Sequence, residues 1–182
     1  MKKIKLLLML VCTGFITTNS IAQTKMVGGA AMYPTKNIVE NAVNSKDHTT
    51  LVAAVKAAGL VPTLESKGPF TVFAPTNEAF DALPKGTVET LLKPENKAKL
   101  TGILTYHVVA GKLTSMDLMN MIKKGMGKAT LKTVNGENIF ITRNGKNLMV
   151  TDENGGIAKI TIADVNQSNG VIHVIDKVLI PE

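Results

Sequence analysis

The stretch TVFAPTNEAF, Thr71 to Phe80, changes character halfway along its length. Thr71, Val72 and Phe73 are β-branched or aromatic, which favours a β-strand. Pro75 ends that pattern, and the residues that follow are typical of the capped start of a helix. Some enzymes expose a nucleophile at such a sharp turn from strand to helix. The stretch is therefore either a reactive elbow or a joint that holds the fold together.

The residue types favour the joint. A nucleophile elbow needs the pattern Gly-x-Ser-x-Gly, because its strained turn tolerates only small neighbours, and residues 74–78 contain neither glycine nor serine. Thr76 suits an N-cap, since its hydroxyl can accept hydrogen bonds from the first-turn amides. Glu78 favours the positive end of the helix dipole. Pro75 and Phe80 have the spacing of a hydrophobic staple.

The N-terminus has the pattern of a secretory signal peptide at residues 1–22. Three lysines precede the apolar run 6–16, and Ser20 and Ala22 provide small residues before the expected cut. The run is short for a membrane span, which needs about 20 residues, so we expect no transmembrane segment in the mature chain. Cleavage would lower the net charge from +7 to +4 by removing those three lysines. We expect a secreted protein, either extracellular or periplasmic.

Removal of the signal peptide would also remove Cys12, the single cysteine of the chain. The mature protein would then have no thiol, which excludes thiolate nucleophiles, thiolate metal sites and thiol redox chemistry. Its stability would have to come from a hydrophobic core, and 45% of the residues are hydrophobic. The aromatic content is 4% with no tryptophan, so platforms for stacking nucleic-acid bases are scarce.

Residues 23–33 are small, glycine-containing and aperiodic, and we interpret them as a flexible tether before one domain at residues 34–181. The first half of this domain predicts short helices, because apolar residues recur there at helical spacing. These helices are expected near residues 37–43, 49–58, 76–83, 94–104 and 116–124. The run from Tyr106 to Val109 predicts a strand.

The second half predicts an antiparallel meander. Asn-Gly pairs begin at Asn135, Asn144 and Asn154, and each separates two β-prone runs. Asn-Gly is a strong hairpin signal, because both residues tolerate the positive φ angles of a type I′ turn. A fourth pair at Asn169 introduces residues 171–180, which are apolar on both faces and predict a central, buried strand. Helices followed by a meander indicate an α+β fold.

Candidate catalytic residues are few. His48, His107 and His173 include no pair at a helical metal-binding spacing. His107 and His173 lie in apolar runs, where a hydrogen-bonded core imidazole is favoured over a catalytic base. Asp176 is a charged residue in the last apolar run and needs a partner or an edge position. A hydrolase built on His107, His173 and Asp176 ranks third as a functional hypothesis, after two binding functions. We expect no enzyme, no metal and no cofactor.

Basic residues gather between residues 112 and 146, where seven lysine or arginine residues stand against two acidic ones. The candidate anionic-ligand patch consists of Lys123, Lys124, Lys128 and Lys132. Such a cluster can attract an acidic glycan or an anionic lipid surface. A solvated basic face that keeps the protein soluble is the alternative interpretation.

Three motifs in order give the chain a resemblance to the fasciclin (FAS1) domain family, from about Pro34 to Pro181. Thr71 to Phe80 resembles the first signature of the family, Tyr106-His107 its central Tyr-His motif, and Asn169 to Pro181 its second signature. The chain looks like a single-domain, secreted, bacterial-type member.

The resemblance implies a wedge-like antiparallel β-sandwich with several short α-helices packed at its edge. It also implies an extracellular adhesion module, whose partner is a cell-surface or matrix protein or a glycan. In some animal members an Asp-Ile pair and the Tyr-His region take part in integrin binding. By that resemblance Asp164, Val165, Tyr106 and His107 are candidate partner-binding residues, with valine standing in place of isoleucine. Thr76, His107, His173 and Asp176 are expected to be structural.

The leading hypothesis is therefore cell adhesion or attachment to a surface or matrix. The second is charge-driven binding of a glycan or an anionic lipid in the cell envelope. No nucleic-acid partner is expected.

Overall fold

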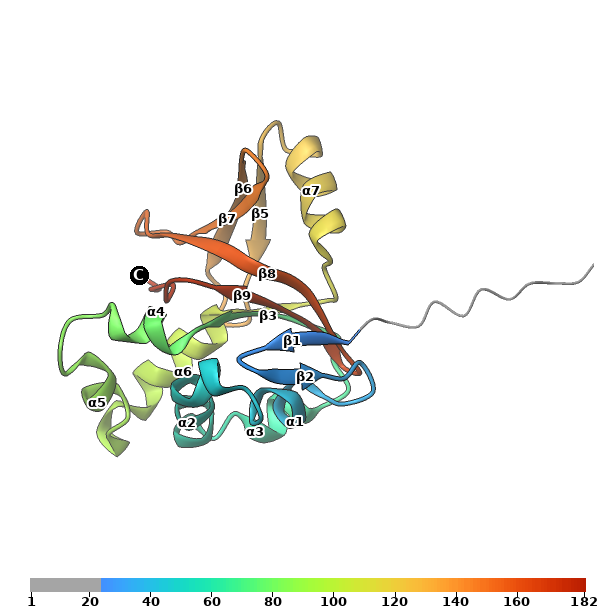
Figure 1. Ribbon diagram of the computed structural model, residues 1–182. Coiled ribbons are helices and arrows are strands. Elements are labelled where there is room, and N and C mark those ends of the chain that lie inside the picture. The colour runs from blue at the N-terminus through green and yellow to red at the C-terminus, as the bar shows by residue number, and fades with distance from the viewer. Residues whose placement is uncertain (1–23) are drawn as a thin grey trace, which may run out of the picture.

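The computed structural model describes residues 24–182, so the signal peptide predicted at residues 1–22 lies outside the described residues. The strands are β1 Lys25–Val27, β2 Ala30–Met32, β3 Phe70–Pro75, β4 Val108–Ala110, β5 Lys128–Lys132, β6 Asn138–Asn144, β7 Asn147–Thr151, β8 Ile157–Gln167 and β9 Gly170–Ile175. The helices are α1 Ile38–Ala42, α2 Thr49–Ala58, α3 Val61–Glu65, α4 Asn77–Asp81, α5 Thr87–Leu91, α6 Lys97–Tyr106 and α7 Ser115–Lys124, with 3-10 turns η1 Lys46–His48 and η2 Pro94–Asn96. Helices α1 to α6 gather on one side of the main sheet, and α7 stands beside β5 at the other end (Figure 1).

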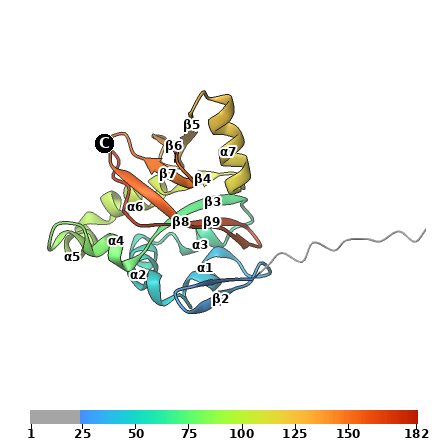
Figure 2. The same cartoon turned by 45° about the horizontal axis from the view of Figure 1, so that its top comes forward.

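The main sheet has seven strands in the order β4-β3-β9-β8-β7-β6-β5. Its two end strands approach each other, since Val109 forms a β-bridge with Thr133, just beyond β5. The Val134 amide also donates to the Val108 carbonyl at 2.7 Å. The sheet is therefore folded back on itself, with β4 close to the β5–β7 end (Figure 2). This gives the wedge of the expected α+β fold, which is confirmed.

Strand β9 lies between β3 and β8, and all six of its residues are buried. The prediction of a central, buried strand is thus confirmed for residues 170–175, although the strand ends before Asp176. It runs parallel to β3, starting from the pair Phe70 and Gly170. A Cβ atom at Gly170 would lie 2.1 Å from the Phe70 carbonyl oxygen. Glycine is therefore required here by the close approach of the two backbones.

The predicted meander is confirmed, because β5, β6, β7 and β8 pair antiparallel in succession. The turns are not of type I′, which needs a positive φ at both central residues. Asn135, Asn144 and Asn154 all keep a φ outside that range, and only the glycine of each pair is left-handed. Gly145, at φ 60°, occupies the first central position between Asn144 and Asn147, as in a type II′ turn.

Residues 25–32 are not the flexible tether that the sequence indicates. Strands β1 and β2 form a hairpin, and Gly28 and Gly29 supply its two positive φ angles. Val27 and Met32 are buried against the helices, and the Lys25 ammonium donates to the Ala163 carbonyl. The prediction failed because each strand has only three residues, too few to show alternation.

The strand predicted from Tyr106 is also wrong at its start. Tyr106 is the last residue of α6, His107 is its C-cap, and β4 begins at Val108. Leu100, Ile103, Leu104 and Tyr106 are all buried, so packing holds the helix up to and including the aromatic residue. The β-prone residues that follow made the boundary look earlier than it is.

Two hydrophobic clusters fill the interior. The helical-side core joins the β1–β2 hairpin and helices α1 to α6 to one face of β3 and β9; it includes Ile38, Leu51, Leu104, Val165 and Ile172. The wedge core lies inside the folded sheet and under α7; it includes Phe73, Tyr106, Leu118, Ile139 and Val150. None of the helices within residues 24–182 has the length and apolar character needed to cross a membrane.

Candidate functional site

The joint at Thr76 is a helix cap, as predicted. The Thr76 hydroxyl accepts a hydrogen bond from the Ala79 amide at 3.3 Å, and Phe80 is buried in the helical-side core. Asn77 adds a connection that the sequence did not reveal. Its side-chain oxygen accepts from the Thr50 amide at 3.0 Å, and its NH₂ group donates to the Lys46 carbonyl at 2.8 Å. The joint therefore fixes α4 to the start of α2 and presents no exposed nucleophile.

Tyr106 is fully buried at the end of α6. Its hydroxyl donates to the Asn138 carbonyl at 2.8 Å and accepts from the Glu153 amide at 3.1 Å. Burial raises the pKa of the Tyr106 phenol to about 12. Its hydroxyl thus joins β6 to the turn after β7, and the side chain is not exposed to a partner.

His107 is 3% exposed, and both of its ring nitrogens are hydrogen-bonded. Nδ1 lies 2.8 Å from the Ile103 carbonyl, to which it donates, and Nε2 accepts from the Leu179 amide at 2.9 Å. This pair of partners defines one neutral tautomer. Burial lowers the pKa of the His107 imidazole to about 4. His107 therefore attaches the C-terminal segment to α6 as a neutral, structural residue.

His173, on β9, is likewise a buried histidine with a partner at each ring nitrogen. Nε2 lies 2.8 Å from the Leu113 carbonyl, Nδ1 accepts from the Asp164 amide at 3.3 Å, and the ring stacks on Phe73 with centroids 5.7 Å apart. Burial lowers the pKa of His173. Asp176 is exposed, and its carboxylate accepts from the Lys159 amide at 2.7 Å. Within residues 24–182 no hydrogen bond connects these two side chains to each other or to His107, so the structure does not form the proposed hydrolytic trio.

Asp164 and Val165 are not an exposed pair. Val165 is 1% exposed, while Asp164 is half-buried at an irregularity of β8 and has a left-handed φ of 57°. The Asp164 carboxylate accepts from the Ser115 amide at 2.6 Å and from the Ser115 hydroxyl. Asp164 therefore anchors the first residue of α7, and its carboxylate is used inside the protein.

The four lysines of the candidate anionic-ligand patch are all exposed, but they belong to two surfaces. Lys128 and Lys132 project from the outer face of β5, and the Lys128 ammonium lies 4.1 Å from the Phe140 ring centroid. Lys123 and Lys124 are at the C-terminal end of α7, which packs against the opposite, buried face of β5. The strand therefore separates α7 from the Lys128 and Lys132 side chains.

Asp152 and Asn169 are buried polar residues whose bonds the sequence analysis missed. The Asp152 carboxylate accepts from the Gly156 amide at 2.6 Å and from the Ile180 amide at 3.1 Å. The Asn169 amide group donates to the Leu64 and Ser66 carbonyls and accepts from the Ile38 amide. A short polar side chain beside a turn glycine indicates hydrogen bonds to nearby backbone groups. The long-range partners of Asp152 and Asn169 could not be predicted from the sequence.

The described part of the chain contains no group of three or more His, Cys, Asp or Glu residues that could hold a metal ion. The folded-back sheet with helices gathered on one side is the fold of a FAS1 domain. Indeed, a FAS1 domain pair from the insect cell adhesion molecule Fasciclin I matches with a TM-score of 0.72 at 18% identity, over 79% of this chain and 50% of that chain.

The fasciclin domain model matches residues 46–181, so the chain belongs to the fasciclin domain family. Protein sll1483 of Synechocystis is 47% identical over 161 residues, which cover 87% of this chain and 81% of that protein. Immunogenic protein MPB70 of Mycobacterium bovis is 37% identical over 77% of this chain and 66% of its own length. Transforming growth factor-beta-induced protein ig-h3 of Sus scrofa is 40% identical over 72% of this chain, which spans only 17% of that much longer protein.

Proposed function

We propose that this protein is exported and that its fasciclin domain attaches to a protein or glycan of a cell surface or matrix. One observation carries the proposal: the chain belongs to the fasciclin domain family and shares its fold with the FAS1 domains of an insect cell adhesion molecule. The polar groups of Tyr106, His107 and His173 all bond to the protein's own backbone. These polar groups are therefore not available to a partner. A partner would contact the solvent-facing side chains of the domain.

The surface beside Asp164 is the proposed contact. Asp164 fixes Ser115, and the next residue, Met116, is 64% exposed in the first turn of α7. Met26 on β1 is 61% exposed, and its neighbour Lys25 bonds to Ala163. Exposed methionines suit adaptable protein contacts, because the thioether chain is flexible and polarisable. Asp164 would then act by positioning Met116, and its own carboxylate would stay bound to Ser115.

The test is binding of immobilised mature protein, residues 23–182, to native cell envelopes and to panels of matrix proteins and glycans. Met116→Asn should reduce saturable binding by about tenfold if Met116 lies at the centre of the contact, since buried interface anchors cost more than 1 kcal/mol when truncated. Met126→Asn is the matched control, because Met126 is 97% exposed in the turn after α7. Absence of saturable binding across all panels would contradict the proposed function.

The second candidate function is charge-driven binding of an acidic glycan or an anionic lipid surface. The observation that favours it is the Lys128 ammonium positioned above Phe140 on an exposed edge strand. Attraction of this kind weakens steeply with salt, because the Debye length falls from about 10 Å at 0.1 M to about 3 Å at 1 M.

The comparison that tests it uses two fourfold Lys→Gln variants with equal charge changes. One alters Lys123, Lys124, Lys128 and Lys132, and the control alters the exposed residues Lys85, Lys93, Lys97 and Lys99 on the helical side. Salt-sensitive binding to heparin or anionic vesicles should be lost in the first variant and kept in the control. Equal loss in both would indicate net charge alone and would exclude a specific site on the outer face of β5 or at the C-terminal end of α7.

A further inference from the structure

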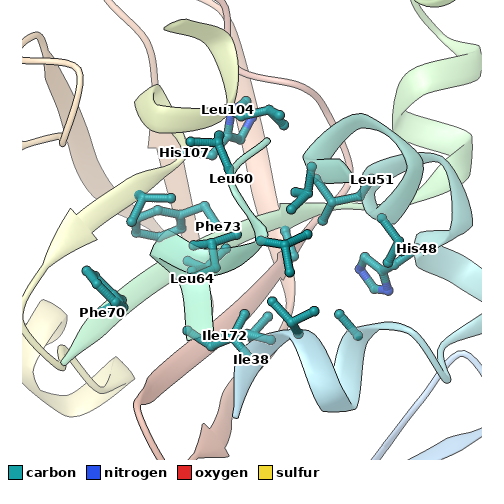
Figure 3. A pocket seen from close by; sticks show the side chains of 18 of the residues that line it. Ile38, His48, Leu51, Leu60, Leu64, Phe70, Phe73, Leu104, His107 and Ile172 are labelled. Carbon is teal, nitrogen blue, oxygen red and sulfur yellow. The ribbon is translucent and has the colours of Figure 1, made fainter. Parts of the chain in front are cut away.

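A cavity of about 80 Å³ lies on the helical side of the main sheet, between β3, β9 and helices α1 to α3 (Figure 3). Its walls are almost entirely aliphatic or aromatic and include Ile38, Leu51, Leu64 and Ile172. The lining also includes the exposed residues Lys56, Thr63 and Val134, so the cavity reaches the surface. It is separate from the Asp164 surface and from the lysines discussed above.

One polar side chain in this wall is incompletely bonded. His48 is 3% exposed, and its Nδ1 lies 2.9 Å from the Ser45 hydroxyl. Its Nε2 has no hydrogen-bond partner within residues 24–182 and is the one buried side-chain nitrogen or oxygen there without one. The Ala74 carbonyl is close enough to favour the protonated ring, but it does not meet the geometry of a hydrogen bond to Nε2.

The contrast with the other two histidines is informative. His107 and His173 each have a partner on both ring nitrogens, as buried imidazoles in proteins normally do. His48 is as buried as His107, yet one nitrogen stays unpaired in the wall of a cavity, with the ring facing the apolar side chains (Figure 3). An unpaired buried polar atom in a native fold needs a cause, and an external partner in the cavity supplies one.

The chemistry of the site restricts that partner. Burial lowers the pKa of His48, so the ring is neutral near pH 7. A neutral ring offers Nε2 either as a donor or as an acceptor, depending on the tautomer. A hydroxyl group can bond to both forms, whereas a carbonyl bonds to only one. A carboxylate would lose its hydration against the aliphatic walls.

We propose that this cavity binds the end of a small aliphatic alcohol, with the hydroxyl hydrogen-bonded to Nε2 of His48 and the hydrocarbon packed among Ile38, Leu51 and Ile172. The size of the ligand follows from the volume. An engineered cavity of about 150 Å³ holds benzene, so a cavity about half that size suits a chain of roughly four carbons.

The test uses 1-butanol and 1-chlorobutane, which are matched in length and differ in the hydroxyl. Each is titrated into the protein while methyl NMR signals of Ile38, Leu51 and Ile172 are followed. Both should shift these methyls and leave Leu91 and Leu100 unmoved, since those residues line a different depression. Only 1-butanol should move the His48 ring ¹⁵N resonances.

Variants separate the hydroxyl contact from apolar filling. His48→Leu should weaken 1-butanol relative to 1-chlorobutane by about fivefold, the effect of one net hydrogen bond. Val55→Phe, at a half-buried wall position, should abolish binding of both probes while the fold is kept. If His48→Leu does not fold, the ring ¹⁵N response of the wild-type protein decides the hydroxyl contact.

Three results would overturn the proposal. The first is no shift of the cavity methyls with either probe, which would mean that Nε2 bonds only to water. The second is an unchanged ratio of the two affinities in His48→Leu. The third is an identical ¹⁵N response of His48 to both probes.

Discussion

Acid should destabilise this protein through His107, and the size of the effect can be worked out from the structure. The neutral ring donates from Nδ1 to Ile103 and accepts at Nε2 from Leu179. A proton on Nε2 would face the Leu179 amide and remove that acceptor. Burial disfavours the charged ring and lowers the pKa of His107 from 6.5 to about 4 in the folded protein.

The sign and magnitude follow from proton linkage. Between pH 6.5 and pH 4 the unfolded chain binds the proton that the folded chain excludes, so stability falls as the pH falls. Above pH 6.5 the His107 ring is mostly neutral in both the folded and the unfolded chain, so protonation of His107 costs almost no stability there. At 1.36 kcal/mol per pKa unit, the full loss is about 3 kcal/mol, of which about 2 kcal/mol is lost between pH 7 and pH 4.5. His48 and His173 act in the same direction, because burial lowers both of their pKa values.

The assay is urea unfolding at a series of pH values, with His107→Gln as the comparison. Glutamine cannot replace both ring nitrogens in place, so the variant should lose about 1–3 kcal/mol at pH 7. It should also show a shallower pH dependence, by about the 2 kcal/mol assigned to the His107 proton. Equal pH dependence in the two proteins, or an NMR titration of the His107 ring near pH 6.5, would refute the reasoning.

Three further substitutions test individual contacts. Thr76→Ala removes the cap of α4 and should lower the free energy of unfolding by about 0.5–2 kcal/mol, seen as a lower melting temperature; an unchanged melt would count against the cap. Tyr106→Phe leaves two backbone groups without the phenol and should cost about 1–3 kcal/mol in urea unfolding. Gly170→Ala places a Cβ 2.1 Å from the Phe70 carbonyl, so the pairing of β3 with β9 must shift; melting at the wild-type temperature would show that the two strands separate freely.

The sequence predicts those parts of the fold that depend on neighbouring residues. The cap at Thr76 and the hairpins at Asn-Gly pairs are decided within five residues, and both are confirmed. The hairpin at residues 25–32 was missed because its strands are too short for a period. The end of α6 was missed because Val108 and Val109 favour a strand, while the buried residues of the helix extend to Tyr106.

The candidate site was less predictable for a different physical reason. Its bonds join residues far apart in the chain: Asp164 holds Ser115 across 49 residues, and His107 holds Leu179 across 72. Nothing local to either residue indicates its partner. The resemblance to the family singled out Tyr106, His107, Asp164 and Val165, but it could not tell whether a side chain at such a position faces a partner or the interior.

His107, Asp152 and Asp164 are therefore better understood as residues that connect separate segments of the fold. His107 and Asp152 bind successive backbone amides, those of Leu179 and Ile180, and so attach the C-terminal segment to the wedge. Asp164 attaches α7 to β8 in the same way. A substitution at one of these residues should lower stability and partner binding together, because binding is lost with the fold. Met116 differs: its side chain is exposed, so Met116→Asn should change binding while the unfolding free energy stays within about 0.5 kcal/mol of wild type. This separation of the two readouts distinguishes a contact residue from a residue that only keeps the domain closed.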